Sequence, residues 1–280
     1  MLNIIDIYDL VDKEKSTKEH YVIKDWVVDL GEKAFSSSYL KSIELPESLL
    51  YIRNMAFKDC TDLEEIEIPN RVTEIGFNAF LRCYRLTKMD LPNSLKRIGK
   101  AAFSGCSGLK TITIPDSVTT IEEGAFVMCK SLTTIDIPSS VTEIARDTFI
   151  ECKSLTSINL PETIKSIGEF AFKDCPELIS LKIPSLVKVI DYGLFSGCTS
   201  LRSVYIPESV IEFKPNVFQG CTQLREIHCR IKDLTNLKIP KNTFTNSILS
   251  QCTFYVPIGT GYAYSHHPIF SKCKDIILEK

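Results

Sequence analysis

The sequence repeats itself every 23 residues, and this period constrains the fold more strongly than any other feature. Eight prolines keep the step without insertion or deletion: Pro46, Pro69, Pro92, Pro115, Pro138, Pro161, Pro184 and Pro207. Phenylalanine, cysteine and leucine recur in the same phase, starting at Phe57, Cys60 and Leu63. A fixed period of about 20 to 50 residues indicates a chain built from stacked structural repeats.

One copy, residues 115–137, shows which positions are expected to be buried. They are Val118, Ile121, Phe126, Cys129, Leu132, Ile135 and Ile137. These positions fit neither a helical period nor one long alternation. The run from Leu132 to Ile137 reads L-x-x-I-x-I, so its end alternates like a short strand, which a proline then stops. A single coil cannot bury these groups, and stacked coils can. The sequence therefore predicts a solenoid with a continuous core, parallel strands on one face and turns on the others.

The copy from Ile114 to Leu132, with Ala125-Phe126 and Cys129 in place, resembles the BspA-type leucine-rich repeat of bacterial and protist surface proteins. The resemblance covers residues 27–257. It implies a leucine-rich repeat solenoid of about ten coils with short parallel β-strands, turns and brief helical pieces, roughly 50 Å long at about 4.8 Å per coil. It also implies a cell-surface or secreted protein associated with adhesion to host proteins and to other bacteria. A fold-level match transfers no site by itself.

The ends of the chain depart from the repeat, as the ends of a solenoid should. We expect an N-terminal cap over residues 1–26, with a strand at Ile4 to Leu10, and a solenoid over 27–257 whose regular copies occupy 46–229. The register slips after Cys229, and residues 252–257 are predicted to form a last strand. Residues 258–280 resemble the C-terminal cap of the family's Bacteroides-like members.

The composition excludes several partner classes. The net charge is −2, so the chain lacks the positive excess that drives nonspecific binding to nucleic acid or anionic lipid. Its apolar runs are far shorter than the roughly 20 residues that span a bilayer, so we expect no membrane insertion. The first ten residues lack the pattern of a secretory signal. Either the chain stays inside the cell or its leader has been removed, and the sequence leaves the localisation open.

The cysteines and histidines do not indicate a disulfide framework, a metal site or a catalytic site. Of the eleven cysteines, eight occur once per coil, as expected of small buried fillers, and the odd total argues against a disulfide framework. The closely spaced cysteine pairs typical of zinc sites are missing. The four histidines, His20, His228, His266 and His267, lie outside or at the edge of the regular array, so no nucleophile with a base is indicated. We therefore expect no metal, no cofactor and no catalysis.

The outward positions of the strands form two columns along one face. The first column comprises Glu44, Glu67, Asp90, Thr113, Asp136, Asn159, Lys182, Tyr205 and His228. The second comprises Ser42, Glu65, Lys88, Thr111, Thr134, Ser157, Ser180, Ser203 and Glu226. The first column changes from acidic residues to Lys182, Tyr205 and His228. This face is either an ordinary solvated sheet or a binding surface. A Ser or Thr two residues after each of six prolines is expected to bond turn backbone groups.

If the chain binds a ligand, the candidate residues are Lys182, Arg202, Tyr205, Arg225 and His228, since Tyr and Arg are favoured interface anchors. The function predicted is non-enzymatic recognition of a protein or glycoprotein on the strand face, as in an adhesin. An intracellular scaffold for a bacterial partner is the alternative, and an enzyme is the least favoured reading.

Overall fold

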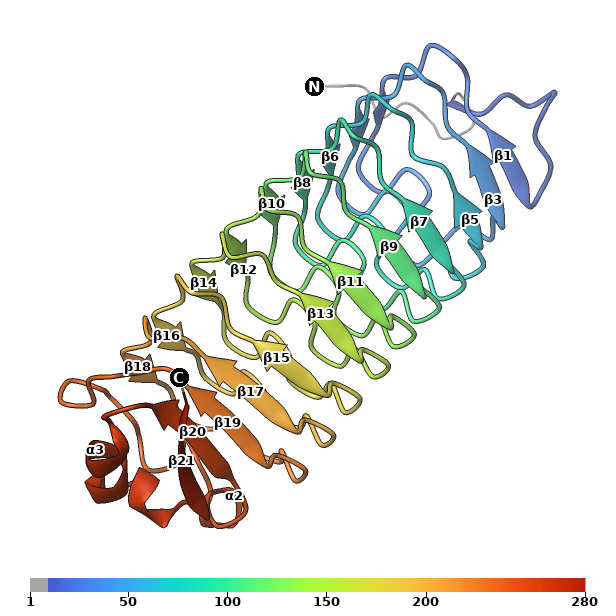
Figure 1. Ribbon diagram of the computed structural model, residues 1–280. Coiled ribbons are helices and arrows are strands. Elements are labelled where there is room, and N and C mark those ends of the chain that lie inside the picture. The colour runs from blue at the N-terminus through green and yellow to red at the C-terminus, as the bar shows by residue number, and fades with distance from the viewer. Residues whose placement is uncertain (1–9, 280) are drawn as a thin grey trace.

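The computed structural model describes residues 10–279, and Figure 1 shows them wound into a parallel β-solenoid. The solenoid has about 11 turns with a repeat of about 23 residues, close to the ten coils predicted. Two ladders of strands run along different faces of the coil (Figure 1). The predicted fold class, a leucine-rich repeat solenoid, is confirmed.

The first ladder, here called the strand face, carries the longer strands. Its members are β1 (His20–Val22), β3 (Ser42–Glu44), β5 (Glu65–Ile66), β7 (Lys88–Asp90), β9 (Thr111–Thr113), β11 (Thr134–Asp136), β13 (Ser157–Asn159), β15 (Ser180–Lys182), β17 (Ser203–Ile206), β19 (Glu226–Cys229), β20 (Thr253–Pro257) and β21 (Asp275–Glu279). All of the pairings between them are parallel and join equivalent residues of successive coils, for example Tyr205 with His228. Side chains alternate: Ile135 is buried, whereas Thr134 and Asp136 are exposed.

The second ladder consists of two-residue strands where the sequence predicted turns and brief helical pieces. Its members are β2 (Asp29–Leu30), β4 (Tyr51–Ile52), β6 (Glu74–Ile75), β8 (Arg97–Ile98), β10 (Thr120–Ile121), β12 (Glu143–Ile144), β14 (Ser166–Ile167), β16 (Val189–Ile190) and β18 (Glu212–Phe213). Each strand buries its second residue. One such residue per coil is too short a pattern to distinguish a strand from a turn by periodicity.

The phenylalanine of each copy forms a continuous stack through the core. Neighbouring ring centroids lie between 5.1 Å apart, for Phe57 and Phe80, and 6.1 Å apart, for Phe172 and Phe195. The planes of these stacked rings are within 16° of parallel from Phe35 to Phe218. Such offset pairs stabilise by about 0.5 to 1.5 kcal/mol beyond the area that they bury.

The repeated cysteines pack beside this stack. Ten of the eleven are buried and all are free thiols. Each repeat thiol donates to the carbonyl of the phenylalanine one coil earlier, as Cys129 Sγ does to the Phe103 oxygen at 3.3 Å. Burial raises the pKa of the Cys152 thiol to about 12, so the thiol stays protonated. The prediction that the ladder cysteines are small core fillers is confirmed.

The hydroxyl two residues after six of the eight repeat prolines also binds main chain. The Oγ atoms of Ser94 and Ser140 donate to the carbonyls of Val72 and Val118 at 2.6 and 2.5 Å. Ser48, Ser117, Thr163 and Ser209 make the equivalent bond. The predicted structural role of these hydroxyls is confirmed, and each bond ties a turn to the coil before it.

The two ends of the described chain differ from the regular coils. Near the N-terminus Val11 forms an antiparallel bridge with Ile23. The predicted strand from Ile4 to Leu10 lies, except for Leu10, outside the described residues. β1 and β21 lie within the segments expected to be caps and pair with the strand face, so the domain boundaries stay a prediction. The C-terminal end adds the short helices α2 (Asn246–Leu249), α3 (Gly261–His266) and η1 (Phe270–Lys272). Across residues 10–279, no helix has the length and apolar character of a bilayer span.

Candidate binding surface on the strand face

The two predicted columns are real features of the strand face. Main-chain pairing aligns Asp90 with Thr113, Asp136 with Asn159, and Lys182 with Tyr205. Every first-column residue from Glu44 to Tyr205 is exposed. Because the strands pair in register, side chains of one column repeat at the strand spacing of about 4.8 Å. A ligand lying across the coils would meet one outward side chain per step.

The five predicted residues gather at the C-terminal end of this face. Lys182, Tyr205 and His228 occupy successive places in the first column. Arg202 and Arg225 immediately precede β17 and β19, and the Arg225 N–H donates to the Arg202 carbonyl at 3.0 Å. The structure thus brings the candidate residues together at one end of the strand face, on two rows separated by the second column, and their role in binding stays a prediction.

The column continues beyond His228 into residues that sequence reasoning missed. His228 pairs with Tyr255, and Tyr255 pairs with Ile277. The His228 ring stacks on Tyr205 at 4.2 Å and on Tyr255 at 4.6 Å, with planes within 10° of parallel. Tyr205 and Ile277 remain 41% and 44% exposed, so both ends of the row face solvent. We call Tyr205, His228, Tyr255 and Ile277 the aromatic ridge.

Two carboxylates flank the His228 ring. Its Nδ1 lies 3.3 Å from a Glu279 oxygen, and its Nε2 lies 3.6 Å from a Glu226 oxygen. Glu279 also accepts from Arg230 at 3.1 Å. The His228 side chain is only 13% exposed, and within residues 10–279 its Nε2 has no hydrogen bond. Rings and carboxylates therefore hold the imidazole in one orientation, which fixes the centre of the ridge.

A row of basic residues borders the ridge, and we call it the basic edge: Arg202, Arg225 and Lys274. Main-chain hydrogen bonds between successive coils place these residues in line. The Thr253 N–H donates to the Arg225 carbonyl, and the Lys274 N–H donates to the carbonyl of Cys252, the residue before Thr253. All three are exposed. Within the described chain no carboxylate lies within 4.0 Å of their cationic groups. Arg225 instead donates to the Thr222 and Leu224 carbonyls at 3.0 and 2.9 Å.

Lys182 differs from the two arginines because it is already paired. Its ammonium donates to Glu162 at 2.6 Å. This bond, together with the Ser185 N–H, lowers the pKa of the Glu162 carboxyl to about 2. The Glu162 carboxylate therefore stays charged at neutral pH. Of the predicted residues, Lys182 therefore has less charge available to a partner than Arg202 or Arg225.

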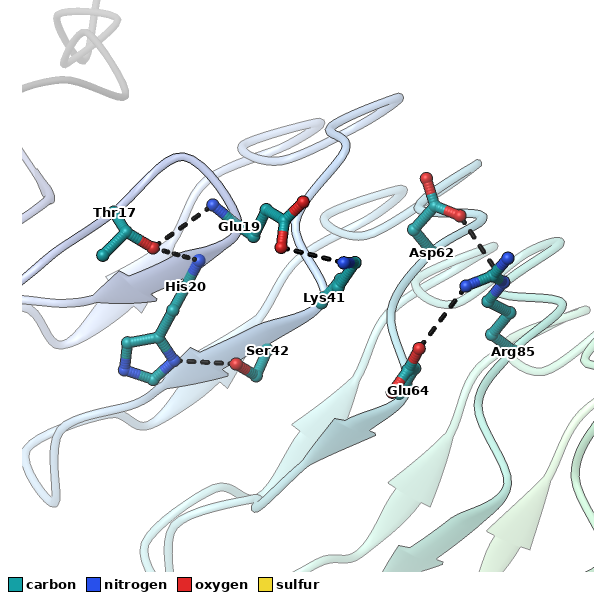
Figure 2. Close-up of polar contacts among 8 residues, drawn as sticks. All are labelled: Thr17, Glu19, His20, Lys41, Ser42, Asp62, Glu64 and Arg85. Atoms are coloured by element: carbon teal, nitrogen blue, oxygen red, sulfur yellow. Dashed lines mark hydrogen bonds and ion pairs between the residues drawn. The ribbon is translucent and has the colours of Figure 1, made fainter.

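Several charged residues at the N-terminal end of the strand face pair with one another (Figure 2). Lys41 donates to Glu19 at 2.8 Å, and Arg85 reaches both Asp62 and Glu64. His20 bonds Ser42 through Nδ1 at 2.7 Å. Lys41 and Glu64 occupy the column that holds Arg202 and Arg225 further along. The same column is thus paired at one end and unpaired at the other.

A groove lies away from the strand face, on the second ladder. This groove of about 520 Å³ opens between β10 and β12, lined by residues that include Thr120, Glu122 and Glu143. The ladder is interrupted here, because β10 ends one sheet and β12 begins another. Arg97 joins Glu74 and Glu122 beside the groove. Its charged lining is therefore largely occupied by internal ion pairs.

The missed ridge residues follow a slip in register. The 23-residue step fails after Cys229, so counting alone does not reach Tyr255. Pro257 ends β20 as Pro207 ends the earlier repeat, and aligning these prolines places Tyr255 at the position of Tyr205. This proline alignment is a sequence signal from which Tyr255 could have been predicted. The contact of Glu279 with His228 depends on the C-terminal segment folding back to form β21, which no motif indicated.

Comparison with known proteins identifies the class of repeat protein. The profile of the family described as BspA type leucine rich repeat region (6 copies) matches residues 28–156 and 142–276. The chain belongs to this family. The resemblance predicted from its repeat is thereby confirmed. No curated protein matched the chain.

Several solved structures are similar. The leucine rich repeat protein of T. pallidum has 29% sequence identity and a TM-score of 0.54, with 76% of this chain and 86% of that chain covered. A leucine rich cell surface protein from Faecalibacterium prausnitzii A2-165 has 22% identity, a TM-score of 0.41, and coverage of 95% and 88%. The pneumococcal vaccine antigen PcpA has 19% identity, a TM-score of 0.46, and coverage of 96% and 91%.

Proposed function

We propose that the chain is a non-enzymatic, adhesin-like module that binds a protein or glycoprotein through the C-terminal half of its strand face. The observation that carries this proposal is the aromatic ridge lying beside the unpaired arginines of the basic edge. Tyr and Arg are among the residues most enriched in interface anchors. Stacked coils hold them on a rigid backbone, so little ordering entropy opposes binding.

Membership of the family supports this proposal. BspA-type repeat proteins are generally non-catalytic, and one similar structure is named as a cell surface protein. A repeat solenoid presents an extended surface on which outward residues vary freely, because the inward residues alone make the core. Non-covalent recognition is the task that such a surface performs best.

A pull-down tests the proposal directly. Pools of purified extracellular-matrix proteins and a bacterial lysate are offered to the wild-type chain and to a Tyr205→Ala, Arg225→Ala, His228→Ala variant. The matched control carries Glu67→Ala, Thr111→Ala and Thr113→Ala, which are exposed positions in the two outward columns nearer the N-terminal end of the same face. We expect capture of a matrix protein, confirmed with the purified component, that the first variant loses and the control keeps. Equal capture by both variants would show that the binding site does not lie at the C-terminal end of the strand face.

An intracellular scaffold for a bacterial partner is the second candidate. The observation in its favour is that all eleven cysteines are free thiols, as in proteins of reducing compartments. Capture from the bacterial lysate alone, together with recovery of the native protein in the soluble cell fraction, would favour this scaffold over the adhesin.

A further inference from the structure

The basic edge contains two like charges in adjacent coils. Arg202 and Arg225 precede paired strands and are joined by a main-chain hydrogen bond of 3.0 Å. Like charges placed opposite one another across neighbouring strands are destabilising. At the equivalent N-terminal positions, Lys41 and Glu64 each have an oppositely charged partner from a neighbouring coil. Within residues 10–279, Arg202 and Arg225 have none at ion-pair distance.

The guanidinium of Arg225 is already oriented by the protein. Its Nη1 donates to two carbonyls of its own turn. Its other N–H groups have no bond to the described residues, so they are free to donate to a ligand. A carboxylate between the two guanidiniums would relieve their repulsion and make charge-assisted hydrogen bonds, which are about twice as strong as neutral ones.

The surroundings limit how much negative charge a ligand can carry. The second column places Glu226 and Asp275 between the basic edge and the aromatic ridge. Glu226 is half exposed and Asp275 is exposed, so both would repel a dense polyanion. Ser203 and Thr253 alternate with them and carry no charge. The surface therefore fits sparse carboxylates next to apolar groups.

We infer that the partner docks an acidic peptide segment here, with one or two carboxylates on Arg202 and Arg225 and an apolar side chain on the ridge at Tyr205. This inference rests on the proposed function and names the partner chemistry of the same surface. Three steps of extended chain, about 10 Å in all, lead from Arg202 to Tyr205. A single short segment of the partner spans that distance.

The test is selection of a displayed library of random peptides on the folded wild-type chain. We expect enrichment of Asp and Glu beside an aromatic or aliphatic residue. Selected peptides, made synthetically, should lose at least tenfold in affinity on an Arg202→Gln, Arg225→Gln variant. The control is Lys110→Gln, an exposed residue of the same column without an ion pair, which should change affinity less than twofold. Heparin is offered in parallel as a sulfated polyanion.

Each outcome decides the inference. Selected peptides without acidic enrichment, acidic peptides that bind the double variant equally, or no selected peptides at all would overturn it. Heparin binding that needs Arg202 and Arg225 while acidic peptides fail would assign the edge to a polysaccharide. Peptides that lack acids but still require Tyr205, tested with Tyr205→Ala, would leave the proposed strand-face function intact while refuting the acidic partner.

Discussion

At the scale of single residues, alternation along the strands decides which side chains stabilise the fold. Leu155 is fully buried, whereas Ser157, two residues further on, is exposed in the second outward column. We expect Leu155→Asp to lower the free energy of unfolding by about 4 kcal/mol or more, because it buries an unpaired charge. Ser157→Asp should change it by less than about 0.5 kcal/mol. Urea unfolding of both variants checks this, and the reverse order would refute the assigned orientation.

The buried thiols make stability depend on alkaline pH. Burial raises the pKa of Cys152 to about 12, whereas in the unfolded chain a thiol titrates near about 8.5. Between these values the unfolded chain releases a proton that the folded chain keeps, so stability falls as pH rises. The loss approaches about 1.4 kcal/mol per pH unit for each such thiol.

A single variant separates the contribution of the Cys152 thiol from that of other groups that titrate at alkaline pH. Urea unfolding at about pH 8 and about pH 10 should show a shallower pH slope for Cys152→Ala than for the wild type. Identical slopes would mean that the Cys152 thiol ionises as easily in the folded array as in the unfolded chain.

At the scale of the elements, a Ser or Thr hydroxyl in six of the coils fastens a turn to the preceding coil. Ser117 Oγ donates to the Leu95 carbonyl at 2.7 Å. Ser117→Ala leaves that carbonyl short of a donor, so we expect a loss of about 1 kcal/mol. Ser157→Ala, on the exposed face, is the matched control and should be nearly neutral. Thermal melts of the two variants compare them, and equal melting temperatures would deny the hydroxyl its structural role.

The elements also show what the sequence could and could not predict. The strand face, its outward columns and the phenylalanine and cysteine ladders followed from a period kept without a break over eight copies. The second ladder did not, because a single buried residue such as Ile75 in β6 carries no alternation. Tyr255 was missed where the register slips, and Glu279 reaches His228 through a long-range contact that no local pattern encodes.

At the scale of the whole molecule, each coil contacts chiefly its neighbours, so the array should tolerate the loss of one complete period. Deleting residues 116–138 joins Pro115 to Ser139 and restores the repeat. We expect a cooperatively folded protein, shorter by about 4.8 Å in small-angle scattering. Deleting residues 116–127 removes about half a period and should prevent folding. Survival of both deletions, or of neither, would contradict the modular account.

The central claim is that partners bind the C-terminal half of the strand face. The most direct test is a hydrogen–deuterium exchange footprint of the chain bound to the partner that it captures. The account predicts slower exchange in peptides covering β17, β19 and β20, with no change in β3 to β7. Protection confined to the N-terminal strands, or to the second ladder around the groove between β10 and β12, would contradict it.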